Sequence, residues 1–219
     1  MNRRDLLRGS LAAGAAVALP ARAIADDLTQ AFDQAFASTP AAAVNSVAYA
    51  NKILTIAARE RDRAGSRLWR TDVVGIADFA LPSSRPRLHF ANLENGAVRS
   101  FLVAHGRGSD PEHDGWLKLF SNTHGSEATS RGAYLTAEWY SGKYGTSIRL
   151  VGLDPDNSQA LPRAIVMHPA AYVDASMAER WGKIGRSEGC FAMARGDFNE
   201  ALWHLSGGRL LFADRIGEG

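Results

Sequence analysis

From about residue 73 onward, the sequence is a succession of short apolar segments separated by turn residues. Asn95-Gly96 lies between two of these segments and is the strongest short-range signal of a β-hairpin. Many short strands with Gly and Pro turns favour a sandwich or barrel over alternating strands and helices. The segments that we expect to form strands are 73–79, 87–93, 97–103, 133–139, 147–153, 163–168 and 209–214.

Helical periodicity flanks this β-rich part on both sides. Between residues 26 and 65, apolar residues recur at helical spacing, which predicts a small helical region that packs on the β-rich part. Near the carboxyl end, Asp197 and Glu200 fit a capping box at the start of a helix. The buried face of this helix would be Phe198, Ala201, Leu202 and Leu205. The predicted fold is therefore mainly β, a sandwich or barrel with short helices, preceded by a small helical N-terminal region.

Residues 1–25 have the features of an export signal. Arg3-Arg4 is followed by a short apolar run over 11–19 and by Ala23-Ile24-Ala25, a small-x-small cleavage site. The run is too short to stay in a bilayer, so no membrane span is expected after cleavage. The paired arginines favour the twin-arginine route, although an ordinary secretory signal stays open. Either route predicts an exported, periplasmic protein.

Removal of the signal changes the charge of the chain. The 25 basic and 23 acidic residues include four Arg and one Asp within 1–25, so 21 basic and 22 acidic residues remain. This balance gives no sign of nucleic-acid binding. The remaining length suits one domain, or one domain with a small appendage. We expect the catalytic part to cover 66–219, after the helical region 26–65. The oligomeric state is left open.

Cys190 is the only cysteine, and it ends the glycine-flanked stretch 185–190 (GRSEGC). A thiol is the best neutral-pH nucleophile among side chains, and Gly189 before it permits a sharp turn and a close approach of substrate. Exported proteins usually pair their cysteines, so a lone thiol suggests reactivity. A buried structural cysteine is the alternative.

A nucleophilic cysteine needs a base, and His168 is the best-placed histidine. It ends the apolar segment 164–167 and precedes Pro169, so a sheet could hold its ring rigidly over a site. A metallopeptidase that uses His105, His124 and His168 with Asp110 or Asp114 is another possibility, although no H-E-x-x-H motif is present.

His168, followed at a distance by Ser187-x-Gly189-Cys190, resembles the signature of the L,D-transpeptidase catalytic domain, which has the YkuD-like fold. Further blocks resemble the branch usually called murein L,D-transpeptidase catalytic domain proteins, and they occur in the same order at 103–109, 120–122, 125–126, 130–134, 140–145 and 163–168. The resemblance covers about residues 70–214. One departure is Glu188, where the commonest family motif has histidine.

The resemblance implies a cysteine acyltransferase that acts on peptidoglycan stem peptides and forms 3-3 cross-links through a Cys190 acyl-enzyme. His168 would serve as acid and base, backbone N–H groups around Gly189 and Cys190 would hold the oxyanion, and Ser187 would position the imidazole or a substrate carbonyl. No metal or other cofactor is implied. The residues expected to contact substrate are His105, Ser130, Arg131, Tyr134, Lys143 and Arg186. An L,D-carboxypeptidase of the same fold and a non-catalytic peptidoglycan-binding protein are the alternatives.

Overall fold

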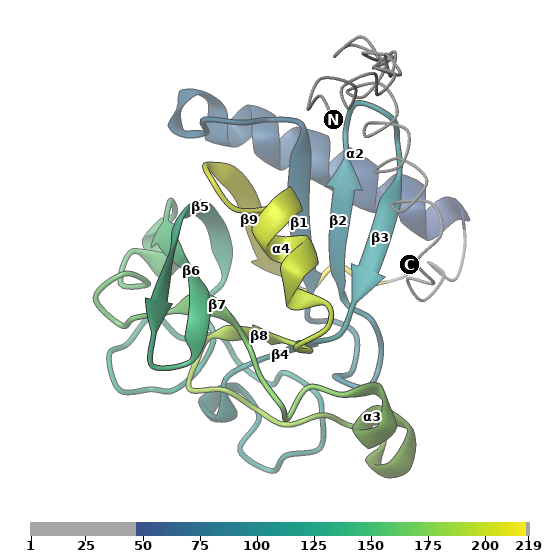
Figure 1. The fold of residues 1–219 in the computed structure, drawn as a ribbon, viewed down its shortest axis with the longest axis vertical. Helices are drawn as coiled ribbons and strands as arrows, with labels where there is room; N and C mark the ends of the chain where they lie inside the picture. The colour runs from purple at the N-terminus through teal and green to yellow at the C-terminus, as the bar shows by residue number, and fades with distance from the viewer. Residues whose placement is uncertain (1–46, 218–219) are drawn as a thin grey trace, which may run out of the picture. The chain divides into compact units, whose positions relative to one another are not determined.

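A computed structural model describes residues 47–217 of the chain (Figure 1). The signal segment 1–25 and the first part of the expected helical region therefore lie outside the described residues. The elements, in chain order, are α2 (Val47–Ala64), η1 (Gly65–Arg67), β1 (Val73–Asp78), β2 (Leu88–Asn92), β3 (Val98–Phe101), β4 (Val103–Ala104), η2 (Arg107–Ser109), β5 (Gly132–Gly142), β6 (Gly145–Gly152), η3 (Pro155–Asn157), β7 (Val166–Pro169), α3 (Ala175–Trp181), β8 (Phe191–Met193), α4 (Phe198–His204) and β9 (Arg209–Asp214).

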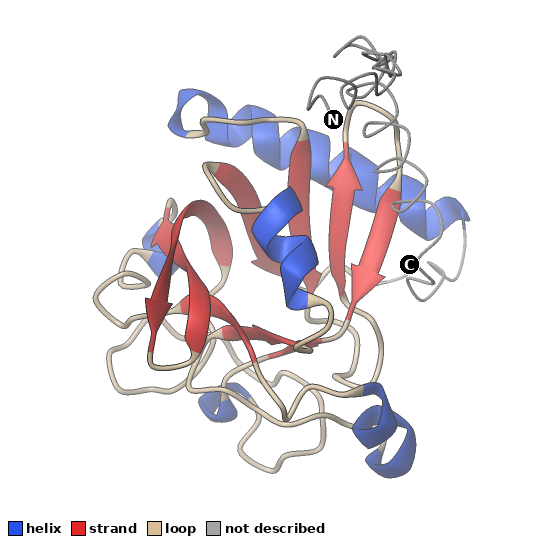
Figure 2. Cartoon of the chain, in the orientation of Figure 1, coloured by secondary structure: helices blue, strands red, loops and turns tan. Residues whose placement is uncertain are grey.

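The described strands form one sheet in the order β3-β2-β1-β9-β5-β6-β7-β8-β4. Strands β3 and β4 lie at opposite ends of this order, although Leu102 alone separates them in the chain. The sheet must therefore coil until its two ends come together at this residue, as in a barrel (Figure 2). The pairs β1/β9 and β7/β8 are parallel, and the other pairs are antiparallel. The prediction of a mainly β, barrel-like fold is confirmed.

Strand β1 is buried on both faces because a helix covers each of them. Val74 and Ile76 pack against α2, which crosses the outside of β1 and β2 (Figure 1). Val73 and Ala77 point the other way, into the core that also contains α4. Gly75 lies between them, and a Cβ on it would be 2.9 Å from a Leu205 methyl carbon. Glycine at this position therefore lets α4 approach the sheet.

The helix at the carboxyl end forms with the predicted buried face, because Phe198, Ala201 and Leu205 are buried in the core and Leu202 packs against it. The predicted capping box is wrong. Asp197 has helical backbone angles (φ −87°, ψ −18°), and its side chain makes no capping hydrogen bond. A capping box occurs instead at η3, between Asp154 and Asn157.

Each predicted strand segment overlaps an observed strand, and most of the differences lie at the ends. Strand β5 extends beyond 133–139 to Gly142, and β6 begins at Gly145 rather than 147. The segment 97–103 is divided between β3 and β4. Strand β7 begins at Val166 rather than 163, because Ala164 has a left-handed backbone (φ 54°) that extended structure excludes. Strand β8 and helix α3 were not predicted. With three and seven residues, they are too short for a periodic pattern to show.

Candidate active site

Strands β7 and β8 bring the predicted nucleophile and base to neighbouring positions of the sheet. These strands are parallel, with Met167 opposite Phe191 and His168 opposite Ala192. Cys190 comes one residue before this register and so lies beside the start of β7. It precedes β8 and is next to the strand that carries His168, two positions before that residue along the sheet. Strand spacing and rise place their Cα atoms roughly 8 Å from each other.

The loop before Cys190 is held by its own hydrogen bonds. The Ser187 hydroxyl donates to the Cys190 carbonyl over 2.6 Å and accepts from the Gly189 N–H over 3.2 Å. Ser187 therefore braces the loop and forms no hydrogen bond with His168. Gly189 has φ +110°, and a Cβ on it would lie 2.9 Å from the Ala128 carbonyl oxygen. Only glycine fits this position without strain.

The Cys190 thiol is buried, with 7% of the residue exposed, and its Sγ lies 3.6 Å from the Ala164 carbonyl oxygen. Burial is the largest effect on the thiol, and it raises the pKa; the charge of Glu188 acts in the same direction. A hydrogen bond from the Val166 backbone and the charge of Arg163 oppose this rise. The thiol is therefore protonated at neutral pH.

Arg163 is a site residue for which the sequence suggested no role. Its guanidinium donates to the carbonyl oxygens of Ser121 (2.6 Å) and Ala128 (2.5 Å) and to the hydroxyls of Ser130 (2.7 Å) and Ser126 (3.1 Å). Burial lowers its pKa, but an arginine stays charged at neutral pH. Arg163 thus places a fixed positive charge beside Cys190. Its only sequence signal is membership of the block 163–168.

His168 has the tautomer that a general base needs. Its Nδ1 lies 3.1 Å from the Pro169 carbonyl oxygen, which can only accept, so Nδ1 carries the hydrogen and Nε2 keeps its lone pair. The ring is stacked on Tyr144, with centroids 4.4 Å apart and an interplanar angle of 20°. Burial lowers the pKa of His168 below its ordinary value of 6.5. The imidazole is consequently neutral at pH 7.

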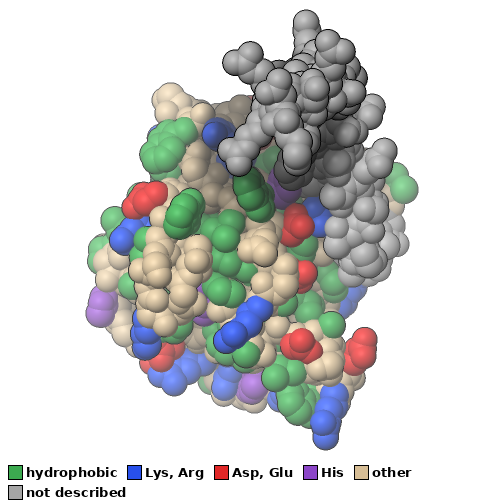
Figure 3. Space-filling view, in the orientation of Figure 1, with side chains coloured by type: hydrophobic (Ala, Val, Ile, Leu, Met, Phe, Trp, Pro, Cys, Tyr) green, Lys and Arg blue, Asp and Glu red, His purple; other side chains and the backbone are tan. Residues whose placement is uncertain are grey.

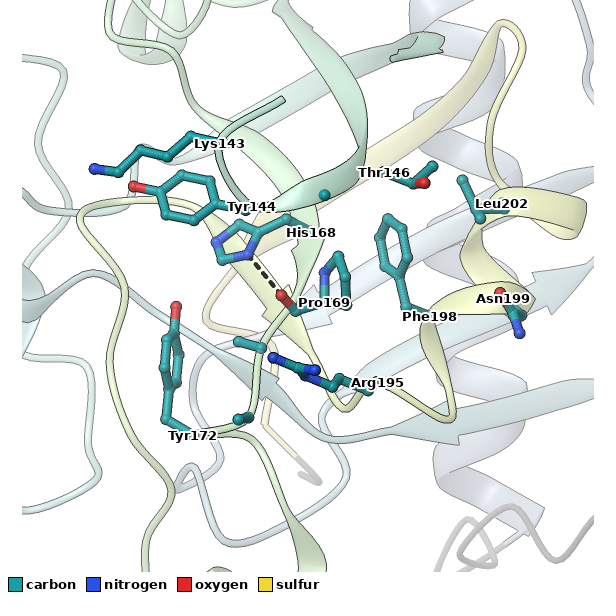
Figure 4. A pocket seen from close by; sticks show the side chains of 13 residues that line it. Lys143, Tyr144, Thr146, His168, Pro169, Tyr172, Arg195, Phe198, Asn199 and Leu202 are labelled. Atoms are coloured by element: carbon teal, nitrogen blue, oxygen red, sulfur yellow. Dashed lines mark hydrogen bonds between the residues drawn. The ribbon is translucent and has the colours of Figure 1, made fainter. Parts of the chain in front are cut away.

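A cavity of about 700 Å³ opens beside His168 (Figure 4). Its lining residues come from the β5–β6 hairpin, β7 and α4 with their flanking loops, and they are Lys143, Tyr144, Gly145, Thr146, His168, Pro169, Ala170, Ala171, Tyr172, Arg195, Phe198, Asn199 and Leu202. Cys190 does not line it, but the charge of Cys190 contributes, after burial, to the raised pKa of Tyr172. The thiol therefore lies close to the Tyr172 wall of the cavity. Apart from His168 and Lys143, none of these residues belongs to the predicted set.

His105 is fully hydrogen-bonded away from the cavity. Its Nδ1 accepts from Arg87 Nη2 over 2.7 Å, and its Nε2 lies 3.3 Å from Asp110 Oδ2. Burial, with the nearby charge of Arg87, lowers the pKa of His105 to about 2. Its carbonyl accepts the Ser187 N–H over 2.9 Å, so His105 supports the nucleophile loop from behind and does not reach the cavity.

Most of the other residues expected to contact substrate are engaged in contacts within the protein. Tyr134 is fully buried, and its hydroxyl donates to the Ser130 carbonyl over 2.7 Å. Arg131 forms an ion pair of 2.8 Å with Asp214. Arg186 donates to the backbone carbonyls of Asp110 and Pro111. Lys143 lines the cavity, with its ammonium 5.2 Å from the centre of the Tyr144 ring.

Residues 47–217 offer no site for a metal ion and no membrane span. They contain no group of three or more His, Cys, Asp or Glu side chains placed to hold a metal ion, so the metallopeptidase alternative has no ligand set in this part of the chain. None of the helices described is long and apolar enough to cross a membrane.

Comparison with known families decides the assignment. Residues 42–213 match the family described as L,D-transpeptidase catalytic domain. The chain belongs to this family. The resemblance inferred from the motifs of this L,D-transpeptidase domain is thereby confirmed. Residues 1–20 match the twin-arginine translocation signal, so the protein is exported to the periplasm by that route.

The solved structures to which this chain is similar have low sequence identity to it. An L,D-transpeptidase from Mycobacterium smegmatis is 13% identical, with a TM-score of 0.39 over 65% of this chain and 58% of that one. The helical cell shape determining protein Pgp2 from Campylobacter jejuni is 12% identical, with a TM-score of 0.42 over 74% and 56%. An L,D-transpeptidase from Xylanimonas cellulosilytica is 15% identical, with a TM-score of 0.38 over 70% and 66%.

The chain thus spans less than two thirds of each of these three structures. No curated protein matches the sequence. The family assignment rests on residues 42–213, and the activity, substrates and partners of the whole protein are proposals.

Proposed function

We propose that the protein is a periplasmic cysteine acyltransferase that acts on peptidoglycan stem peptides and forms 3-3 cross-links. The observation that carries this proposal is the position of Cys190 directly before β8, next to the parallel strand β7 that carries His168, with Nε2 of His168 unprotonated. In the proposed domain arrangement, 1–25 is the cleaved signal, 26–65 is a helical region and 66–219 is the catalytic domain.

The reaction proceeds in two steps, acylation of Cys190 and transfer of the acyl group to an amine. Cys190 Sγ attacks the carbonyl carbon of the third stem residue while His168 Nε2 takes the thiol proton. His168 then returns this proton to the departing amine of the D-alanine, and a thioester remains on Cys190. In the second step, the side-chain amine of a diaminopimelate on another stem attacks the thioester, a new amide forms, and the thiol regains its proton.

The resting state is a neutral pair, since burial raises the pKa of Cys190 and lowers that of His168. His168 therefore acts as a general base during attack, and no preformed thiolate–imidazolium pair is required. The positive charge of Arg163 beside the thiol favours the thiolate as it forms.

The proposed oxyanion donor is the Cys190 backbone N–H, because the Gly189 N–H already donates to Ser187. Removal of one oxyanion donor costs about 10²–10³ in kcat in enzymes of this type. The role proposed for Ser187 is to hold the loop so that this N–H keeps its direction.

A hydrolase that uses water in the second step is the second candidate, because the cavity is open and would admit water. A binding protein without turnover is the third, and Glu188 is the residue that favours it. However, the Glu188 side chain is 59% exposed and lies 3.7 Å from Arg107. It is thus turned toward solvent rather than toward the thiol.

Muropeptide analysis by mass spectrometry tests the proposal. The wild-type protein should produce 3-3 cross-linked dimers from tetrapeptide muropeptides, and Cys190→Ala should produce none. Tripeptides without dimers would identify the hydrolase instead. A carbapenem should add its mass to the intact wild-type protein and not to Cys190→Ala. A folded, reduced wild-type protein with neither product nor adduct would contradict both enzymatic candidates.

A further inference from the structure

Two arginines stand apart from the others in residues 47–217. Nearly all arginines of this part of the chain have an interaction partner. They are Arg59, Arg61, Arg63, Arg67, Arg85, Arg87, Arg99, Arg107, Arg131, Arg149, Arg163, Arg180, Arg186, Arg209 and Arg215. The side chains of Arg70 and Arg195 have no hydrogen bond, ion pair or ring contact with any described residue. Arg70 lies outside the cavity, whereas Arg195 lines it.

Arg195 extends into the cavity on the side of the histidine. Figure 4 shows its guanidinium in the space between Pro169 and Tyr172, below the His168 ring. Asn199, in α4, lines the same cavity and contributes a side-chain amide to its wall. An unpartnered guanidinium is a fork of N–H donors that matches a carboxylate in geometry and charge.

The charge of the cavity points to an anion. Its lining contains no Asp or Glu, and its cations are Lys143 and Arg195. Acidic and basic side chains both occur on the face of the molecule shown in Figure 3. Figure 4 shows Lys143 running outward over Tyr144, away from Arg195. Arg195 is therefore the cation that a group beside His168 would meet.

The proposed reaction places such a group there. His168 protonates the departing amine, and in an α-amino acid the carboxylate carbon is two bonds, about 2.5 Å, from that nitrogen. We propose that Arg195 binds the terminal carboxylate of the amino acid that leaves. Arg195 then determines specificity for stem peptides that end, with a free carboxylate, one residue beyond the scissile bond. This inference rests on the proposed function.

A pair of synthetic tetrapeptide stems tests this assignment, one with a C-terminal carboxylate and one with a C-terminal amide. For the wild-type protein, kcat/KM should be about 10- to 100-fold higher for the carboxylate, as expected for a hydrogen-bonded ion pair. Arg195→Ala should remove the preference, because kcat/KM for the carboxylate should fall far more than kcat/KM for the amide. Arg195→Lys should retain part of the preference, since it keeps the charge without the fork.

Arg70→Ala is the matched control, because it removes an equally unpartnered charge outside the cavity and should keep the preference of the wild type. Equal rates for the two wild-type substrates would overturn the assignment to Arg195 without affecting the proposed function. So would a preference that survives in Arg195→Ala, or an equal loss of both rates in that variant.

Equilibrium binding separates this inference from the chemistry. In a Cys190→Ala background, which cannot turn over, the carboxylate peptide should bind about 10- to 100-fold more tightly than the amide, and Arg195→Ala should abolish the difference. If the wild-type protein shows no turnover but this binding difference is found, the proposed function fails and the carboxylate site stands. Equal binding of the two peptides would overturn the carboxylate site.

Discussion

His105 follows β4 and His168 lies in β7, and these two strands flank β8. The two histidines differ in how many of their ring nitrogens form hydrogen bonds. Both ring nitrogens of His105 are engaged, by Arg87 and Asp110. His168 has one engaged nitrogen and one that is free beside an open cavity. Both nitrogens of His105 are bonded to buried groups of the scaffold, whereas Nε2 of His168 can accept a proton from a group beside the cavity. His105 therefore has a structural role, whereas His168 is the histidine that we propose as the proton acceptor.

The largest expected effect is on activity, at His168. His168→Gln removes the lone pair of Nε2 and should lower kcat/KM by about 10²–10⁴, the usual contribution of acid–base catalysis. Its stability should change by only about 1 kcal/mol, because the ring donates a single hydrogen bond and stacks on one aromatic ring. Turnover and urea unfolding measured on the same preparation check this. Wild-type activity in the variant would remove His168 from the mechanism.

His105 should show the opposite balance. His105→Ala leaves Arg87 and Asp110, both fully buried, without the imidazole between them. Loss of one partner from a buried charged network costs about 3–5 kcal/mol. Urea unfolding should show this loss, whereas kcat/KM of the protein that remains folded should fall less than in His168→Gln. A stable His105→Ala variant with no activity would mean that His105 takes part in catalysis.

The sequence allowed the main elements to be predicted, because strands alternate with clear turn signals, and Cys190 and His168 stand in a recognisable motif of the family. It could not show that Tyr134, Ser130 and Arg131 serve the scaffold, because exposure and partners depend on the coiling of the sheet. The place of Arg195 in the cavity could not be predicted for the same reason. It reaches the cavity from the turn that connects β8, a strand of three residues, to α4.

Acid should destabilise the protein through His105. Its pKa is about 2 in the folded protein, against about 6.5 when unfolded. The unfolded chain therefore binds this proton below pH 6.5 while the folded one does not, so stability falls as pH decreases toward 2. The loss from this group between pH 7 and pH 4.5 is about 2.5 kcal/mol. His105→Gln, which can still accept from Arg87 and donate to Asp110, should reduce the acid loss by this amount in urea unfolding. An unchanged loss would show that His105 is protonated alike in both states.

The smallest effect should appear at Gly189, where the two regions touch. The backbone of Gly106, next to His105, packs so closely on Gly189 that a Cβ on Gly106 would lie 2.7 Å from Gly189 N. Gly189→Ala places a side chain at φ +110° and 2.9 Å from the Ala128 carbonyl oxygen. We expect a loss of about 1–3 kcal/mol in stability and a fall in kcat/KM, because the loop that carries Cys190 must shift.

Two control glycines separate the cost of the positive φ at Gly189 from the cost of the contact with Ala128. Gly125→Ala has a positive φ of 76° in open space, so it reports the cost of the backbone conformation alone. Gly196→Ala meets nothing within 4 Å and has no positive φ, so it should leave stability unchanged or slightly raised. If Gly189→Ala behaves like Gly125→Ala in stability and keeps full activity, the contact with Ala128 does not hold the loop. The loop would then be held by the hydrogen bonds that Ser187 forms with the Gly189 N–H, the Cys190 carbonyl and the His105 carbonyl.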